Sequence, residues 1–240
     1  MTPRVEVSLA WAGDGAAHLR GLMVRLGEDA YAKPSALPGW TRAHVLTHVA
    51  RNADAMMNLL TWARTGVETP AYASDEQRDA DIEAGARRSA AVIRADVEET
   101  SDRLSQVVKK MPEQAWSATV RHRTGVEIPA AAIPWMRARE MWIHAVDLDV
   151  GASFADMPIP MAVELLTDVA ANLSQRPGVP AMRLVADDGG REWAVGDGSG
   201  PVTRVLGPMA DLAAWVSGRG RSRAVRRDDG TAPPELPGWL

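Results

Sequence analysis

Residues 134–148 read PWMRAREMWIHAVDL, and the helix that they predict carries two residues of the metal-ligand type. Glu140 and His144 are four residues apart, so on a helix they lie one turn apart on the same face. The residues around them are mostly apolar, and a carboxylate and an imidazole in such a setting need polar partners. Two arrangements meet that need: a metal site, or a Glu–His hydrogen bond inside the core.

A third metal ligand would have to come from a facing helix, and the chain offers few residues for it. It contains five histidines and no cysteine. His44 and His48 form another pair four residues apart. His44 falls in the first turn of its predicted helix, where the positive end of the helix dipole disfavours a further positive charge. We therefore predict His48 as the ligand and His44 as a neighbour at the rim of the site.

Two histidines and one carboxylate with open coordination positions are typical of a catalytic metal site. These ligands do not distinguish zinc from iron(II) or nickel. Asn52 follows His48 by four residues, and we consider it a candidate to orient the His48 imidazole from behind.

Helical periodicity predicts four long helices in the first part of the chain, at residues 5–27, 42–64, 74–110 and 130–148. Thr41 and Ser74 are the predicted N-caps of the second and third helices. A short β-hairpin is predicted within residues 116–129. Four helices that direct metal ligands inward predict a four-helix bundle, which we place at residues 1–152.

The composition changes after Gly151, and residues 153–240 predict a smaller α+β domain. A helix is expected at residues 159–175 and a shorter one at 208–216. Three β-like runs, separated by glycine-rich turns, are expected at residues 182–186, 191–195 and 201–206. The expected fold is thus mainly α, with two domains.

Composition and charge limit the partners of the 240-residue chain. The formal net charge of −4 gives no electrostatic reason to expect nucleic acid or an anionic membrane. No stretch approaches the roughly 18 uninterrupted apolar residues of a membrane span. The start lacks the apolar run of a signal peptide, so we expect a cytoplasmic protein. We expect a monomer that acts on a small molecule.

The absence of cysteine has a chemical consequence. It excludes disulfides, cysteine-ligated zinc and a protein thiol nucleophile. Any thiol chemistry must therefore come from a bound small molecule.

Three segments carry a resemblance to a known family. They are PGWTRAHVLTHVARN at residues 38–52, the stretch at 134–148, and SGRG at 217–220. Together they resemble the mycothiol-dependent maleylpyruvate isomerases, within the DinB-like superfamily of metal-dependent bundles. The first segment marks the superfamily, and the combination is more specific. GVETPAY at 66–72 and PGWL at 237–240 extend the resemblance over nearly the whole chain.

The resemblance implies a fold, a site and a reaction. A DinB-like bundle would bind a divalent metal, usually zinc, at positions that match His48, Glu140 and His144. A smaller α+β domain would follow, and its Arg219 matches an arginine that is important for activity. The implied reaction converts maleylpyruvate into fumarylpyruvate in the gentisate route of aromatic catabolism, with mycothiol as the thiol cofactor.

The chemistry of that reaction agrees with the composition. A thiolate can add to a cis double bond, allow rotation about the resulting single bond, and leave. The substrate has carboxylates, which a guanidinium matches well. Arg219, placed between two glycines, is the candidate for that role, although it could equally be a solvated loop residue. Arg42 and Arg139 are weaker candidates, and we expect them in salt bridges of the bundle.

Two further functions stay open from the sequence. A mycothiol S-transferase that conjugates electrophilic metabolites would need the same metal ligands and the same thiol. A metal-binding or regulatory module without catalysis would also retain the ligands, but it would have no thiol-dependent reaction.

Overall fold

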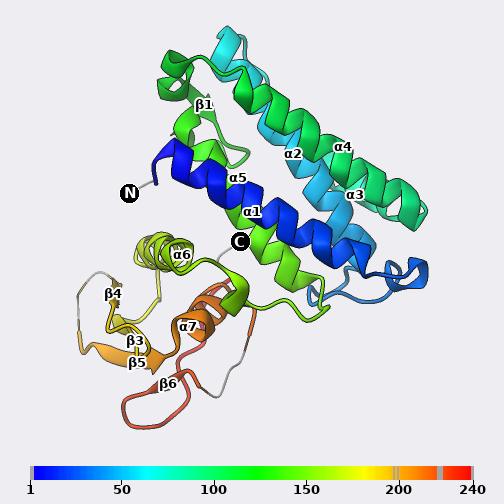
Figure 1. The fold of residues 1–240 in the computed structure, drawn as a ribbon. Helices are drawn as coiled ribbons and strands as arrows, with labels where there is room; N and C mark the ends of the chain where they lie inside the picture. Colours follow the sequence, from blue (N-terminus) through cyan, green and yellow to red (C-terminus); the bar gives the residue numbers. More distant parts are fainter. Residues whose placement is uncertain (1–2, 197, 199, 221–223, 239–240) are drawn as a thin grey trace. The chain divides into compact units, whose positions relative to one another are not determined.

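The computed structural model describes residues 3–196, 198, 200–220 and 224–238, which fall into two compact units divided between residues 152 and 153. The chain is mainly α-helical with a small sheet, as predicted (Figure 1). Among the described residues, no helix combines the length and the apolar character needed to cross a membrane.

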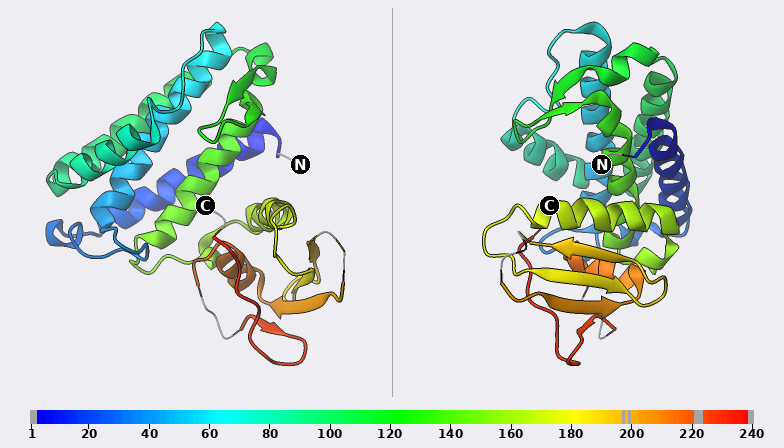
Figure 2. Two further views of the ribbon diagram at one scale, coloured as in Figure 1. Left: turned by 180° about the vertical axis from the view of Figure 1, so that it is seen from behind. Right: turned by 90° about the vertical axis from the view of Figure 1, so that its left-hand side faces the viewer.

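The first unit is the predicted four-helix bundle. Its long helices are α1 (Val5–Val24), α2 (Arg42–Thr65), α4 (Ala90–Lys109) and α5 (Ile133–Asp147). Helix α1 packs along α5 and α2 packs along α4, while contacts between α2 and α5 join the two pairs (Figure 2). Single-turn 3₁₀ segments lie at Glu28–Ala30, Glu113–Ser117 and Ala130–Ala132.

The prediction of one long third helix at residues 74–110 is wrong. Residues 74–110 form two helices, α3 (Asp75–Ala86) and α4, with a break at residues 87–89. The Ser89 hydroxyl accepts a hydrogen bond from the backbone N–H of Val92 and so starts a new helix. Gly85 lies so close to α2 that a β-carbon there would clash with Thr47. The break therefore lets α3 pack against α2 instead of continuing along the axis of α4.

The start of α2 is defined by a reciprocal cap. The Thr41 hydroxyl accepts from the backbone N–H of His44, and the backbone N–H of Thr41 donates to His44 Nδ1 at 3.2 Å. Gly66, at φ 73°, ends the helix in the left-handed region. The predicted N-cap at Thr41 is confirmed, and so is Ser74, whose hydroxyl accepts from the N–H of Gln77.

The predicted hairpin is also present. Strands β1 (Thr119–Arg121) and β2 (Glu127–Pro129) pair antiparallel, with Val120 opposite Ile128. Val120 is buried against the bundle, so the hairpin closes the end of the core formed by the second half of α2.

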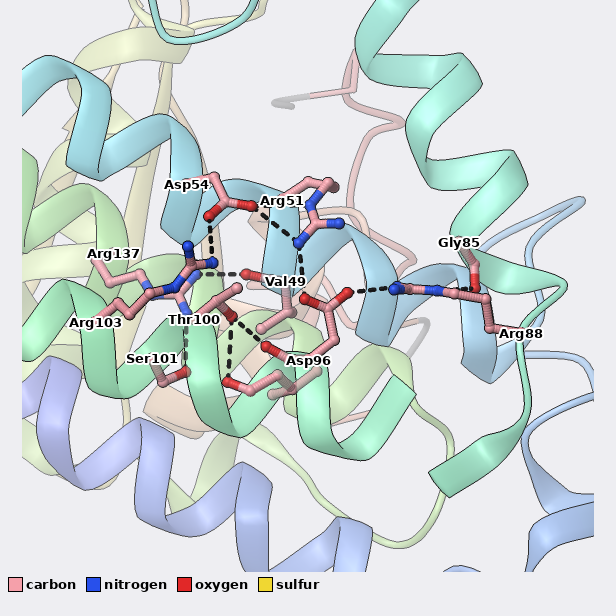
Figure 3. A network of polar contacts seen from close by, with 11 residues as sticks. Val49, Arg51, Asp54, Gly85, Arg88, Asp96, Thr100, Ser101, Arg103 and Arg137 are labelled. Carbon is pink, nitrogen blue, oxygen red and sulfur yellow. Dashed lines mark hydrogen bonds and ion pairs between the residues drawn. The ribbon is translucent and has the colours of Figure 1, made fainter. Parts of the chain in front are cut away.

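An ionic network ties α2 to α4 (Figure 3). Arg51 donates to Asp54 at 3.0 Å and to Asp96 at 2.8 Å. Asp96 also accepts from Arg88, in the break between α3 and α4. Arg103 donates to Asp54 at 3.0 Å. Since Asp96 is largely buried, its two arginine partners compensate for the loss of water around its carboxylate.

The second unit combines α6 (Ile159–Leu173) and α7 (Met209–Val216) with a sheet of four strands. The strands are β3 (Met182–Ala186), β4 (Glu192–Val195), β5 (Thr203–Gly207) and β6 (Arg226–Arg227), in the order β4-β3-β5-β6. Strands β3 and β5 are parallel, and the other two pairs are antiparallel. Buried and exposed residues alternate along β3, β4 and β5, so the helices cover one face of the sheet. The sequence reading missed β6, which is two residues long.

Gly15 allows α1 to approach α5 closely. A β-carbon at Gly15 would lie 2.8 Å from the Met141 β-carbon and 2.8 Å from the Trp142 ring. The Trp142 indole N–H donates to the Trp11 carbonyl oxygen at 2.9 Å, which holds the ring in place.

We expect Gly15→Ala to lower the free energy of unfolding by about 1–3 kcal/mol, because the added methyl group overpacks this contact. Gly21→Ala is the matched control, because a β-carbon at Gly21 of the same helix meets nothing within 4 Å. The control should raise the stability by about 0.5–1 kcal/mol through the helix preference of alanine. Urea unfolding followed by circular dichroism measures both. A Gly15→Ala protein as stable as the Gly21→Ala protein would contradict the close packing.

Candidate metal centre

His48, Glu140 and His144 meet where α2 contacts α5. His48 lies in the second turn of α2, and the other two lie one turn apart on α5. One potential ligand atom from each residue lies within 4.8 Å of the others. The structure therefore brings together the three residues predicted as metal ligands.

Both imidazoles direct Nε2 toward the same carboxylate oxygen. Glu140 Oε2 lies 2.9 Å from His48 Nε2 and 3.1 Å from His144 Nε2. The planes of the two rings are at 82° and their centroids are 4.6 Å apart, so the rings meet edge to face. The two histidines are nearly buried, while the Glu140 side chain keeps 21% of its exposure. The Glu140 side chain is therefore the most exposed of the three.

The charges of the three groups depend on one another. Burial by itself would raise the pKa of Glu140, but the hydrogen bonds from His144 and His48 outweigh it and hold this pKa well below its ordinary value. Burial lowers the pKa of His48 despite the hydrogen bond to Glu140. For His144 burial is again the largest influence, but Asp147 and Glu140 together raise the pKa to about 9.

Asp147 orients His144 from the side opposite Glu140. Its Oδ2 lies 2.9 Å from His144 Nδ1, and Asp147 is completely buried. A carboxylate on Nδ1 places the proton there and leaves Nε2 available as a ligand. The sequence analysis did not identify Asp147. Its spacing of three residues from His144 on a predicted helix would have placed the two side chains on the same face.

The Nδ1 atom of His48 has a different neighbour from the one expected. Arg78 Nη2, from α3, lies 3.3 Å from it, and the Arg78 guanidinium lies 5.8 Å from the centre of the Tyr72 ring. Asn52, the candidate to orient His48, accepts a hydrogen bond from Arg137 at 2.7 Å. Arg78 could not be found from the sequence, because nothing in the pattern of α3 indicated which residue would face α2.

His44 is part of the helix cap and not of the ligand group. Its Nδ1 accepts from Thr41, and its Nε2 lies 3.0 Å from Glu83 Oε2. Trp40 lies between the two histidines of α2, with ring centroids 6.2 Å from His44 and 5.7 Å from His48. This arrangement agrees with the placement of His44 beside the site.

Arg42 and Arg139 were expected in salt bridges. Arg42 instead donates to two carbonyl oxygens at the end of α5, Leu148 at 2.7 Å and Asp149 at 2.8 Å. The last carbonyl oxygens of a helix have no hydrogen-bond donor within the helix, and Arg42 supplies donors to two of them here. The Arg139 guanidinium lies 5.7 Å from the centre of the Trp135 ring.

Arg219 lies in the second unit, in the turn after α7. Its backbone N–H donates to the Ala214 carbonyl oxygen and its Nη1 donates to the Ser217 carbonyl oxygen, each at 2.8 Å. Gly218 precedes it with φ 76°. The turn is therefore held by its own hydrogen bonds, and the Arg219 side chain is half-buried.

The geometry of the three residues fits a divalent metal. Two Nε2 atoms and one carboxylate oxygen converge from two helices, and Asp147 keeps one imidazole in the tautomer that ligation needs. Such a set is the one that catalytic sites use when they keep a coordination position open.

A family described as the mycothiol maleylpyruvate isomerase N-terminal domain matches residues 12–149, the segment that supplies all three residues. The chain belongs to this family. A crystal structure of the mycothiol-dependent maleylpyruvate isomerase is 32% identical over the full length of both chains, with a TM-score of 0.93. A histidine-to-alanine mutant of that isomerase matches at the same identity and coverage, with a TM-score of 0.92.

A more distant structure shares the fold alone. YfiT from Bacillus subtilis, described as a probable metal-dependent hydrolase with an unusual four-helix bundle topology, is 16% identical. It covers 62% of the present chain and 90% of its own, with a TM-score of 0.52. No curated protein sequence matches the chain. Membership of the mycothiol maleylpyruvate isomerase N-terminal domain family confirms the family resemblance seen in the sequence.

We predict that His48→Ala abolishes stoichiometric zinc binding, because it removes one of the three converging ligand atoms. His122→Ala is the control, since His122 lies in the β1–β2 hairpin and its Nδ1 contacts Thr124. Titration calorimetry on chelator-treated protein measures the affinity, and circular dichroism verifies the fold. Full zinc affinity in His48→Ala would show that the group is not the metal site.

Asp147→Asn tests the support of the site with the ligands intact. The amide keeps the shape of the buried side chain but removes the charge that holds His144 in place. We expect zinc affinity to fall about 10–100-fold, as for other partners of metal-bound histidines. An affinity equal to that of the unaltered protein in the same calorimetric titration would contradict this role.

Proposed function

We propose that the chain is a metal-dependent isomerase that uses mycothiol to convert maleylpyruvate into fumarylpyruvate. The convergence of His48, Glu140 and His144 on one point carries the proposal, because it occurs in a chain of this family. The full-length similarity to a mycothiol-dependent maleylpyruvate isomerase supports the choice of substrate and thiol.

In this proposal the three residues hold the metal, for which we expect zinc. A dication held by these residues would lower the pKa of a thiol bound to it. Two neutral imidazoles and one carboxylate leave such a centre with a net positive charge, so the residues favour an anionic partner. Asp147 stabilises His144 in the required orientation, and the apolar surroundings keep the electrostatic attraction strong.

The nucleophile has to come from outside the chain. Conversion of a cis double bond into a trans one requires a temporary single bond, which addition of a thiolate provides. The chain has no cysteine, so mycothiol would supply the thiol.

Each of the two units would contribute different residues to the reaction. We propose residues 1–152 as the metal-binding domain and residues 153–240 as the domain that contributes Arg219. The Arg219 guanidinium already donates from Nη1 to the Ser217 carbonyl oxygen in this turn, which limits the freedom that it would lose on binding a carboxylate. Arg219 would act as a catalytic residue by binding a carboxylate of the substrate.

The activity can be tested directly with zinc-loaded protein and maleylpyruvate, with mycothiol and glutathione supplied in parallel. We expect the maleylpyruvate absorbance to be lost only with mycothiol, and chelator-treated protein to be inactive until zinc is restored. Formation of mycothiol adducts with electrophiles, without isomerisation, would replace the isomerase with the S-transferase. Stoichiometric zinc without any thiol-dependent reaction would instead favour a non-catalytic module.

Arg219→Gln tests the substrate contact. Loss of a charge-assisted hydrogen bond costs about 1.5–3 kcal/mol, so we expect kcat/KM to fall about 10–100-fold with zinc affinity unchanged. Arg204→Gln is the control, since Arg204 is exposed on β5 and pairs with Glu192 at the surface. Steady-state kinetics at varied maleylpyruvate decides the point. Equal kcat/KM values for the two variants would exclude Arg219 from substrate binding.

A further inference from the structure

A pocket separates α1 from α4 in the first unit. It has a volume of about 340 Å³, within the range of small-molecule sites. Its floor is apolar and buried, and consists of Met56, Leu60 and Ile133. None of the residues that line it is His48, Glu140 or His144, so the pocket is distinct from the metal centre.

The sequence of α1 explains why the bundle is open there. Between Leu9 and Arg20, which also line the pocket, the side of α1 that faces it carries small residues, Ala12, Gly13, Ala16 and Ala17. Helix α1 packs along α5 and makes few contacts with α4. At these four positions α1 therefore lacks the large side chains that would close the seam between α1 and α4.

The inner end of the pocket carries a buried cation. Arg137 lines the pocket and is only 5% exposed. Its Nη1 donates to the Val49 carbonyl oxygen at 2.9 Å and its Nη2 lies 3.5 Å from Ser101 Oγ (Figure 3). Nη1 also donates to Asn52 Oδ1 at 2.7 Å.

Arg137 has no carboxylate in direct contact among the described residues, although the charges of Glu140 and Asp54 act on it from a distance. All three hydrogen-bond partners are uncharged, and the part of the chain that the structure describes places no carboxylate in an ion pair with it. Burial lowers the pKa of Arg137 to about 10, which still leaves the guanidinium protonated at neutral pH. A buried charge without a carboxylate in direct contact is costly, and Arg137 lines a pocket that can admit an anion.

We propose that this pocket binds a small amphipathic monocarboxylate. The carboxylate would pair with Arg137, and the apolar body would lie between the small residues of α1 and the floor. Arg137 is the single cation at the buried end. At the exposed rim Asp102 lies 4.0 Å from Arg20, and Lys109 also lines the pocket, so the buried end and the rim differ in their exposure to water.

Octanoate and 1-octanol are suitable probes, because they share an apolar chain and differ in the charge of the head group. Titration calorimetry and ligand-observed NMR on the full chain would measure their binding, with and without zinc. We expect octanoate to bind at least tenfold more tightly than 1-octanol, and zinc to leave its affinity unchanged within about twofold.

Two variants locate the binding. Arg137→Met removes the charge at similar length, and should weaken octanoate about tenfold or more while leaving 1-octanol unchanged. Gly13→Phe narrows the pocket and should weaken both probes. Gly21→Phe is its control, because Gly21 is a glycine of the same helix outside the pocket with equally free space around it. Circular dichroism verifies each fold, and Gly13→Phe keeps the test decisive if Arg137→Met does not fold.

Three results would overturn the proposal. The first is no octanoate binding to the folded protein. The second is octanoate binding that Gly13→Phe leaves unchanged. The third is octanoate binding that zinc displaces or His48→Ala removes, which would place the ligand at the metal centre. In that last case the role of Arg137 would be limited to donating hydrogen bonds to the backbone and amide oxygens around it.

Discussion

The carboxylate of Glu140 joins the two helix pairs of the first unit. It belongs to α5 but accepts hydrogen bonds from an imidazole of α2 as well as from one of its own helix. Because burial alone would favour its neutral form, its charge depends on both histidines remaining in place. The histidines in turn depend on groups behind them, Asp147 for His144 and Arg78 for His48. The contact between α2 and α5 is therefore polar at this point. Glu140 depends on the two histidines for its charge, and the histidines depend on the side chains behind them for their orientation.

Arginine provides many of the other polar ties in the bundle. Arg42 completes the carbonyls at the end of α5, and Arg51 and Arg88 share the buried carboxylate of Asp96. Arg137 binds a backbone oxygen and an amide oxygen inside the bundle. A guanidinium suits these positions because it presents several donors in a fixed plane and can satisfy two acceptors at once. These arginines supply hydrogen-bond partners for polar groups of α2, most of which is buried. An unpaired polar group would be costly there.

The sequence predicted the parts of the molecule that follow from local rules. Helical periodicity and the Thr41 cap placed α2, and the spacing of Glu140 and His144 placed both on one face of α5. It did not predict the break before Ser89, because both sides of the break carry helical patterns and only the approach of Gly85 to Thr47 shows why the axis turns. Arg78 and the carbonyl partners of Arg42 also depend on which helices meet, which local pattern does not determine. The spacing of three residues between His144 and Asp147, in contrast, is a local pattern that places both side chains on one face of α5.

The cap at Thr41 and the imidazole of His48 belong to one short segment, and this limits how the segment can change in length. The hydroxyl of Thr41 starts α2 seven residues before His48, with His44 completing the cap between them. Each inserted or deleted residue turns the later part of a helix by about 100° relative to its start. A single insertion between His44 and His48 would therefore leave the cap intact and direct the His48 imidazole away from α5. Substitutions can accumulate in this segment, but insertions and deletions cannot, so its length should vary far less among related chains than its composition.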